Sequence, residues 1–462
     1  MARAPPGGRR DAVKGPPIAA LTAWASQTLG SDVRLDLIPG GGSRTSFVVR
    51  ASDARKYILR LDNGDGPLSG TRFTLEREHR VISALGDAGP RVPGIIAYSA
   101  AHNAMLMEFV DGATHYQATP DPERQAHIQR DLMRQIAKLH ALRPDEIGLP
   151  DFAAFGTIRC ALEHDLATLA EMYGRPATPK DPVIDFALHW LADHIPDPED
   201  RACLVHGDIG PGNFLFDEEG RVTALLDWEV VHMGHPLEDV AAILCRSLGA
   251  PFGTALDHVR NYEDVRGGAI DRRSLDAMVI LVLTRWYVGL NLGLSHPSIN
   301  QNLAVILSFR QSVAYTLACM LAKVHGIDVP PLRRGTERTA DGGIPLHDFI
   351  VHGLEAVIGP TLSDPYLVER AKGLATLARY LRDLDAVGTE RLAREEREAI
   401  EVLLGARFPN RETAIDAACQ AARTMRGNEA VGLVNCMLAF ATRRQRIWAD
   451  AMGEMAYRRM DY

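Results

Sequence analysis

The chain has 462 residues, of which 46% are hydrophobic and 24% are charged. This length accommodates two or three domains, and this balance is typical of a soluble globular protein. The formal net charge of −8, without a long basic stripe, argues against a nucleic-acid partner. No continuous apolar run reaches the 18 or more residues of a membrane span, so no membrane association is expected.

The first seventeen residues are basic and rich in Pro and Gly, but they lack the apolar segment of a secretory signal. We interpret residues 1–17 as a disordered tail. The six cysteines are scattered without a C-x-x-C pair, which favours reduced thiols in a cytoplasmic protein.

Residues 18–110 predict a small β-sheet with two helices. Helices are expected at Ile18–Leu29 and Phe73–Leu85, and strands at Val33–Ile38, Phe47–Arg50, Lys56–Leu61, Gly94–Tyr98 and Ala104–Val110. A turn containing Gly41, Gly42 and Ser43 separates the first two strands. Such a turn lets backbone N–H groups approach nucleotide phosphates, although the G-K-[ST] of a P-loop is absent. A plain hairpin turn is the alternative interpretation.

Residues 111–325 have mainly helical periodicity. Helices are expected at Pro122–His140, twice between Phe155 and His194, and at Asp239–Leu248, Ser274–Leu294 and Asn300–Val324. Short apolar runs at Ala202–Val205, Phe214–Phe216 and Val222–Leu226 predict strands between these helices.

The most informative stretch runs from Leu204 to Val240. Asp208 lies on a loop rich in Gly and Pro, Asn213 follows five residues later, and Asp227 comes directly after an expected strand. In phosphoryl transfer from ATP, one carboxylate accepts or orients the proton of the attacking hydroxyl. An amide oxygen and a second carboxylate hold Mg²⁺. This order therefore predicts Asp208 as the catalytic residue and Asn213 and Asp227 as metal ligands.

Two further side chains of this stretch have open roles. His206 could join His232 and His235 in a zinc site, but the H-x-x-H spacing has no supporting cysteine. The alternative is that His206 orders the loop by hydrogen bonding. Glu229 could lie beside the metal or contact the acceptor substrate.

The H-G-D and N elements, with L-D-W-E at 226–229 and G-H-P at 234–236 followed by Asp239, resemble the aminoglycoside phosphotransferase and choline kinase-like superfamily. The resemblance is strongest to the branch found near, or fused to, acyl-CoA dehydrogenases. It extends over residues 18–325 and indicates the class of enzyme but not the substrate. It implies a bilobal protein-kinase-like α+β fold that uses ATP and Mg²⁺.

The resemblance also implies roles for individual residues. Arg60 would contact the α- and β-phosphates and pair with Glu78, while backbone groups around Glu108 and Val110 would contact the adenine edge. Asp239 would tie down the catalytic loop. The chain has Arg44 where members of the superfamily often have Asn, and G-H-P where they usually have G-D-P.

Beyond the catalytic region the chain changes character. Residues 326–344 are rich in Pro, Gly and charge and predict a linker, and residues 345–462 predict an all-α bundle. Its helices are expected at Leu346–Ile358, Pro365–Leu384, Thr389–Leu404, Arg411–Thr424 and Asn428–Met455. This part resembles an uncharacterised helical domain that accompanies such phosphotransferases. We expect it to pack on the kinase domain, or to mediate a homo-oligomer or recruit a partner enzyme.

These observations predict a cytoplasmic ATP-dependent phosphotransferase acting on a small-molecule hydroxyl. Residues 18–110 would form the nucleotide-binding lobe and residues 111–325 the catalytic lobe. The resemblance suggests a hydroxyacyl-CoA or similar metabolite as acceptor, while the wider superfamily allows an aminoglycoside or amino alcohol. A cationic aminoglycoside would favour a dense acidic run, which Ser274–Val324 lacks. A non-catalytic pseudokinase and a zinc hydrolase are the alternatives from other functional classes.

Overall fold

The computed structural model describes residues 18–38, 44–64, 68–86, 89–176, 178–295, 302–334 and 346–462. The predicted tail, the glycine turn and residues 335–344 of the predicted linker lie outside these ranges. The chain divides into two units, Met1–Ser83 with Pro93–Val110 and Ala84–Val92 with Asp111–Tyr462.

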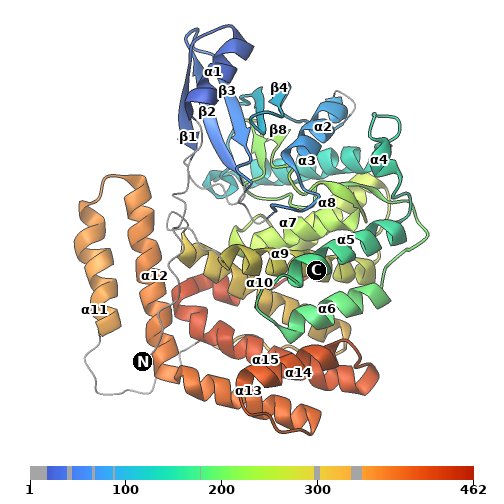
Figure 1. Ribbon diagram of the computed structural model, residues 1–462, viewed down its shortest axis with the longest axis vertical. Coiled ribbons are helices and arrows are strands. Elements are labelled where there is room, and N and C mark those ends of the chain that lie inside the picture. The colour runs from blue at the N-terminus through green and yellow to red at the C-terminus, as the bar shows by residue number, and fades with distance from the viewer. Residues whose placement is uncertain are drawn as a thin grey trace, which may run out of the picture. The chain divides into compact units, whose positions relative to one another are not determined.

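The first unit is built on a five-stranded antiparallel sheet with strand order β1-β2-β3-β5-β4 (Figure 1). Its elements are α1 (Ile18–Leu29), β1 (Val33–Ile38), β2 (Thr45–Ala51), β3 (Lys56–Leu61), α2 (Leu75–Leu85), β4 (Ile95–Ser99) and β5 (Ala104–Glu108). The register pairs Arg60 of β3 with Ser46 of β2 and with Met105 of β5. Arg60 therefore lies on an interior strand of the sheet.

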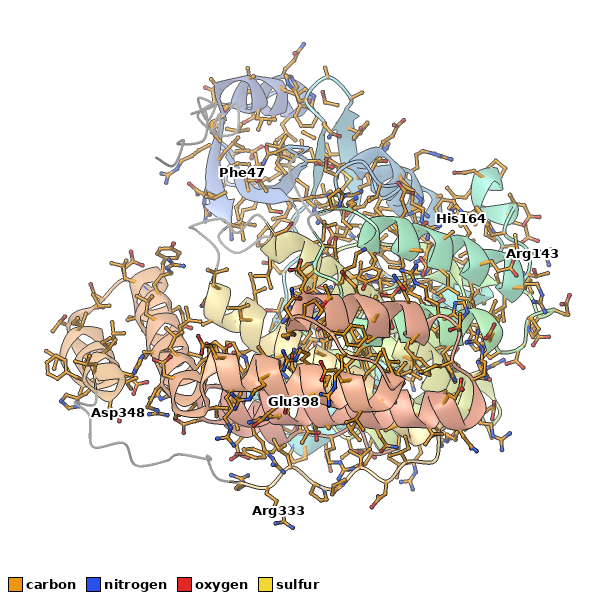
Figure 2. The ribbon with its side chains drawn as sticks, turned by 60° about the horizontal axis from the view of Figure 1, so that its bottom comes forward. Phe47, Arg143, His164, Arg333, Asp348 and Glu398 are labelled. Atoms are coloured by element: carbon orange, nitrogen blue, oxygen red, sulfur yellow. The ribbon has the colours of Figure 1, made fainter. Side chains whose placement is uncertain are left out.

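Alternation along the strands separates the two faces of this sheet. Phe47 (labelled in Figure 2), Val49 and Leu59 are buried in one core with Leu21 of α1. Because successive side chains of a strand point to opposite faces, Arg60 lies on the face away from this core. That face carries the candidate phosphate-binding cation.

The second unit begins with a helical region that contains two small antiparallel sheets, β6–β9 and β7–β8. Its helices are α3 (Pro122–Ala141), α4 (Pro150–Ala153), α5 (Ile158–Tyr173), α6 (Pro182–Asp193), α7 (Leu237–Gly249), α8 (Ala255–Arg266), α9 (Arg272–Leu294) and α10 (Leu303–Val324). Its strands are β6 (Cys203–Val205), β7 (Phe214–Phe216), β8 (Val222–Leu225) and β9 (His232–Gly234). Asp121, Asp181 and Asp271 cap α3, α6 and α9 by accepting backbone N–H bonds, which explains where these helices begin.

Two of these helices, α9 and α10, are long and apolar enough to cross a bilayer, with mean hydropathies of 1.6 and 1.4. The expectation from run length missed them because isolated polar residues interrupt each helix. In the structure 72% of the apolar window of α9 and 56% of that of α10 are buried. They therefore resemble the core helices of a folded domain.

The second unit continues into an all-helical C-terminal region. It comprises α11 (Leu346–His352), the π-helical turn η3 (Gly353–Ile358), the 3₁₀ turn η4 (Gly359–Thr361), α12 (Pro365–Val387), α13 (Thr389–Leu404), α14 (Arg411–Ala422), α15 (Gly427–Met452) and the 3₁₀ turn η5 (Gly453–Tyr457). Helix α15 packs on α10, and α14 packs on α6. Ion pairs of 2.8 Å join Arg423 to Asp185 and Arg426 to Asp193.

The predicted fold class is confirmed: an antiparallel-sheet unit, a helical region and an all-helical C-terminal region follow one another along the chain. The short elements α4, α8 and β9 were not predicted from the sequence. The strand expected at Val222–Leu226 ends at Leu225, so Asp227 does not directly follow it. Asp227 instead has a left-handed φ of 64°, because the chain turns sharply after the strand.

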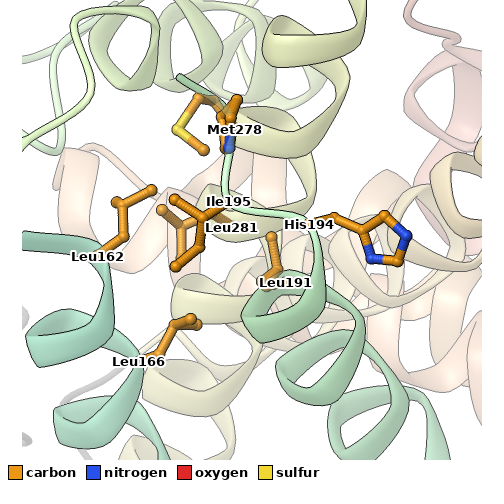
Figure 3. A pocket seen from close by; sticks show the side chains of 8 residues that line it. Leu162, Leu166, Leu191, His194, Ile195, Met278 and Leu281 are labelled. Atoms are coloured by element: carbon orange, nitrogen blue, oxygen red, sulfur yellow. The ribbon is translucent and has the colours of Figure 1, made fainter. Parts of the chain in front are cut away.

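A small apolar pocket lies among α5, α6 and α9 (Figure 3). It is lined by four leucines together with His194, Ile195, Pro196 and Met278. None of the candidate site residues lines it. We therefore assign it to imperfect packing of the helical core.

Buried His258 should make the stability of the second unit pH-dependent. Burial lowers its pKa to about 4, and its ring bonds to the Phe252 carbonyl and stacks on the Phe252 ring. An unfolded histidine has a pKa near 6.5, so the stabilisation present above about pH 6.5 is lost as the pH falls toward 4. We expect urea denaturation to show a loss of up to about 3 kcal/mol over this window.

The variant His258→Gln should reduce this pH dependence, because the amide does not titrate. The exposed His115→Gln should leave it unchanged. An undiminished pH dependence in His258→Gln would contradict the assignment.

Candidate active site

The candidate catalytic loop comprises residues 206–213, between β6 and β7. Gly207 and Gly210 have φ values of 82° and 144°, conformations that favour glycine. A Cβ on Gly207 would lie 3.1 Å from both the His232 ring and the carbonyl oxygen of Val230. The loop thus needs glycine both for its backbone conformation and for its close packing.

Asp208 is held within this loop by Asn213. The side-chain Nδ2 of Asn213 donates to the Asp208 backbone oxygen at 2.8 Å and to its carboxylate Oδ2 at 3.0 Å. The orientation of Asn213 is therefore fixed, with its amide nitrogen toward Asp208 and its amide oxygen turned away from it.

Arg246 of α7 forms the strongest contact with Asp208. Its Nη2 lies 2.5 Å from Oδ2 and its Nε 3.1 Å from Oδ1, a bidentate ion pair, while Nη1 donates to the Pro211 carbonyl at 3.1 Å. Burial acts against the charge of Arg246, but the Asp208 carboxylate outweighs it and raises the Arg246 pKa. The guanidinium therefore stays charged and fixes the rotamer of Asp208.

The side chain of Arg246 reaches Asp208 across Gly210. A Cβ on Gly210 would lie 2.7 Å from Cδ of Arg246, so any other residue at this position would push the arginine away. Sequence reasoning missed Arg246. A signal was present, because Arg246 lies seven residues after Asp239 and so shares its face of α7.

Asp239, at the start of α7, fixes the other end of the loop. Its carboxylate accepts the backbone N–H groups of His206 at 2.9 Å and Gly207 at 2.8 Å, and it bonds to His140 at 3.0 Å. Burial acts to raise the pKa of Asp239, but the bond from His140 and the nearby imidazoles outweigh it and lower the pKa. Both oxygens of the buried Asp239 carboxylate therefore take part in hydrogen bonds.

His206 connects the loop to the segment that carries Asp227. Its Nε2 bonds to the Leu226 carbonyl at 2.8 Å, and its ring lies 4.6 Å from that of Trp228. Because a carbonyl only accepts, Nε2 carries the proton. Burial lowers the pKa of His206, so the ring is held neutral. His206 therefore orders the loop by hydrogen bonding.

Asn213 and Asp227 lie on neighbouring backbone segments, since the Leu226 N–H donates to the Asn213 carbonyl at 2.8 Å. Asp227 is half-buried, and its charge acts on Arg246 together with that of Glu229. The amide oxygen of Asn213 and the carboxylate of Asp227 are hard oxygen donors, the kind Mg²⁺ prefers. Burial raises the pKa of the neighbouring thiols Cys203 and Cys245, so no thiolate competes from there.

The other histidines considered for a zinc site have separate partners. His232 bonds to Glu238 at 3.1 Å, and His235 bonds to Asp197 at 3.4 Å. The carboxylate of Glu238 also pairs with buried Arg285 at 2.8 Å. Across the described residues, no group of three or more His, Cys, Asp or Glu side chains is placed to hold a metal. His232, the first residue of β9, thus belongs to a buried polar network with Glu238 and Arg285.

In the first unit, Glu78 of α2 pairs with two arginines. Arg60 Nη1 lies 2.8 Å from Oε1, and Arg44 contacts Oε2 while donating to the Phe73 carbonyl at 3.1 Å. The side chains of Glu78 and Arg44 are almost fully buried, whereas that of Arg60 is 12% exposed. Arg60 is therefore the more accessible of the two arginines that share Glu78.

The remaining predicted nucleotide contacts are partly described. Glu108 ends β5, two residues before Val110, and its backbone N–H donates to the Gly94 carbonyl at 2.8 Å. The strand predicted to reach Val110 is therefore two residues shorter. Gly41, Gly42 and Ser43 lie outside the described residues.

Comparison with known proteins identifies the family. A model described as the phosphotransferase enzyme family matches residues 34–275, more than half of the chain. The chain belongs to this family. Its matched region contains the whole candidate catalytic loop, Asp227 and the Arg60–Glu78 pair.

Two curated relatives of this chain have acyl-CoA dehydrogenase names. Rat acyl-CoA dehydrogenase family member 11 is 32% identical over 241 residues, which cover 48% of this chain and 30% of the rat protein. Mouse family member 10 is 28% identical over 210 residues, covering 44% and 19% respectively. The match thus spans less than a third of each relative.

Among solved structures, a Ralstonia eutropha chain described as an aminoglycoside phosphotransferase aligns with a TM-score of 0.50 and 23% identity. The alignment covers 64% of this chain and 94% of that chain. At this identity the likeness shows the fold.

Replacing Glu78 with Gln should destabilise the first unit, because two buried arginines would lose their shared counter-charge. We expect a loss of about 3–5 kcal/mol, measured by hydrogen exchange of β3 and α2. Glu76→Gln, an exposed change on the same helix, should cost about 0.5 kcal/mol or less. Equal effects of the two variants would contradict the buried cluster.

Replacing Arg246 with Met should loosen the catalytic loop while keeping the aliphatic stem beside Gly210. Since the ion pair is partly exposed, we expect a stability loss of about 1–2 kcal/mol, with faster hydrogen exchange in residues 206–213. Arg221→Met removes another arginine–aspartate pair, on the β7–β8 turn, and should leave exchange in this loop unchanged. Unchanged exchange in Arg246→Met would show that Arg246 does not order the loop.

Proposed function

We propose that this chain transfers the γ-phosphoryl group of ATP to a hydroxyl of a small molecule. Family membership supports phosphoryl transfer, and the contacts of Asp208 support the catalytic assignment. Asp208 is held by Arg246 from one side and Asn213 from the other, so its carboxylate has a fixed direction before any substrate binds. Fixed positioning of a polar group is the main contribution a protein can make to this reaction.

Asp208 would accept the hydrogen bond of the acceptor hydroxyl and orient its oxygen. The bidentate pairing with Arg246 fixes the direction of the carboxylate, which suits this orienting role. Arg246 itself would act as a positioning residue for Asp208. Glu229 would contact the acceptor or lie next to the metal ligands.

Asn213 and Asp227 would hold Mg²⁺ through their side-chain oxygens. When bound, Mg²⁺ supplies positive charge to the phosphate oxygens. Arg60 would contact the α- and β-phosphates, with Glu78 fixing its guanidinium. Arg44 also pairs with Glu78, so one buried carboxylate positions both arginines.

We propose a hydroxyacyl-CoA or similar hydroxyl metabolite as the acceptor. The support is the similarity to regions of acyl-CoA dehydrogenase family members 10 and 11. An aminoglycoside or an amino alcohol is the second candidate, since the Ralstonia structure with the same fold carries the aminoglycoside name.

The substrate proposal is tested by incubating the chain with ATP, Mg²⁺ and one acceptor at a time. The panel should contain hydroxyacyl-CoAs, amino alcohols and aminoglycosides, and mass spectrometry should detect the gain of one phosphoryl group. We expect the gain on a hydroxyacyl-CoA. A gain on an aminoglycoside alone would overturn the acceptor, and consumption of no ATP with any acceptor would overturn the reaction.

Replacing Asp208 with Asn should lower turnover by about two to four orders of magnitude, because a neutral amide binds the acceptor hydroxyl less strongly and loses the ion pair with Arg246 that fixes its direction. The KM for ATP should change little, and the thermal midpoint should fall no further than in Arg246→Met, because both variants remove the same ion pair. Asp217→Asn, on the neighbouring β7–β8 turn, should retain activity. Near-wild-type turnover in Asp208→Asn would remove Asp208 from its assigned role.

A further inference from the structure

The C-terminal region contains a helical hairpin made of α11, η3 and α12. Helix α12 packs on α10 and α15, and α11 packs on α12. In Figure 1, α11 lies on the side of α12 that is turned away from α10 and α15. No residue of α11 is fully buried.

This hairpin concentrates exposed apolar side chains. Nine of the fifteen exposed large hydrophobic side chains in the described parts of the chain lie between Leu346 and Leu381. Phe349 is 76% exposed and Leu346 62%. Isolated exposed apolar residues are common on protein surfaces, but a concentration of this kind indicates a binding surface.

The apolar residues avoid the polar contacts of the hairpin. Arg382 pairs with Asp348 (labelled in Figure 2), and Arg379 pairs with Glu355, both at 2.6 Å. At about 100° per residue, Ile350 is displaced by about 160° from Asp348 around α11. The ion pairs therefore close one side of α11, and its apolar residues face another.

On α12 the exposed leucines repeat every seven residues, at Leu367, Leu374 and Leu381. A seven-residue repeat forms a nearly straight stripe along a helix, the pattern through which helices pair. The stripe is displaced by about 140° from Arg379, so it too is separate from that ion pair.

We propose that the α11–α12 hairpin is a dimerisation surface that binds the same hairpin of a second copy of this chain. The stripe is symmetric about Leu374, so a two-fold axis beside Leu374 places Leu367 of each chain opposite Leu381 of its partner. Two hairpins related in this way form a four-helix bundle with a self-complementary contact.

The exposed area is sufficient for such a dimer. The nine residues are 45–76% exposed, and at roughly 100 Å² each they provide about 900 Å² per chain. A stable protein–protein interface requires about 800 Å² per partner. This inference does not depend on the proposed phosphoryl transfer.

Sedimentation velocity of the full chain over a concentration series tests the proposal. We expect a species of twice the 50.6 kDa chain mass. Leu374→Glu and Phe349→Glu should each weaken association by about tenfold or more, because a charge would be buried in the contact. The matched control is Val402→Glu on α13, which places the same charge at an 85% exposed apolar site outside the hairpin and should leave the dimer intact.

Cysteine cross-linking tests the position of the two-fold axis. Its result does not depend on whether a glutamate variant folds correctly. Leu374→Cys should form a disulfide-linked dimer on mild oxidation, visible on a non-reducing gel, whereas Val402→Cys should not exceed the wild type. A wild-type chain that stays monomeric at all concentrations overturns the proposal. So does a dimer that survives both glutamate variants, because association would then use another face.

Discussion

The catalytic loop depends on one helix, α7, which holds it with two charged side chains two turns apart. Asp239 accepts backbone N–H groups at the start of the loop, and Arg246 binds the carboxylate of Asp208 further along. The two ends of the loop are thus fixed to a single rigid element. The helix supplies hydrogen bonds that the irregular backbone of the loop lacks.

The positions of Asp239 and Arg246 along α7 match the dipole of the helix. The carboxylate of Asp239 lies near the helix N-terminus, where the helix dipole favours a negative charge, and Arg246 lies in the last turn, where it favours a positive one. Asp239 is fully buried and bonds to His140 of α3, so the same carboxylate connects the loop to α3. The buried group formed by Arg285, Glu238 and His232 continues this polar network to α9.

The first unit also contains a buried charged side chain that binds two partners. There a single buried carboxylate, Glu78, is shared by Arg44, which directly follows the glycine turn in the sequence, and Arg60 of β3. Arg44 occupies the place where an uncharged Asn is usual in the superfamily that the sequence resembles. In this chain one buried carboxylate therefore binds two arginines.

The sequence by itself determined the fold class, because strand alternation and helical periodicity in the first 110 residues are local patterns. The same holds for most helices, whose bounds follow capping residues such as Asp121 and Asp181. It also placed Asp208, Asn213 and Asp227 in one stretch, since they are close along the chain. Only the tertiary structure decided that β6 pairs with β9, that Arg44 binds Glu78, and that Arg246 forms an ion pair with Asp208. These contacts join residues separated by about 30 positions or more, and no local propensity encodes which distant partner a charged side chain will meet.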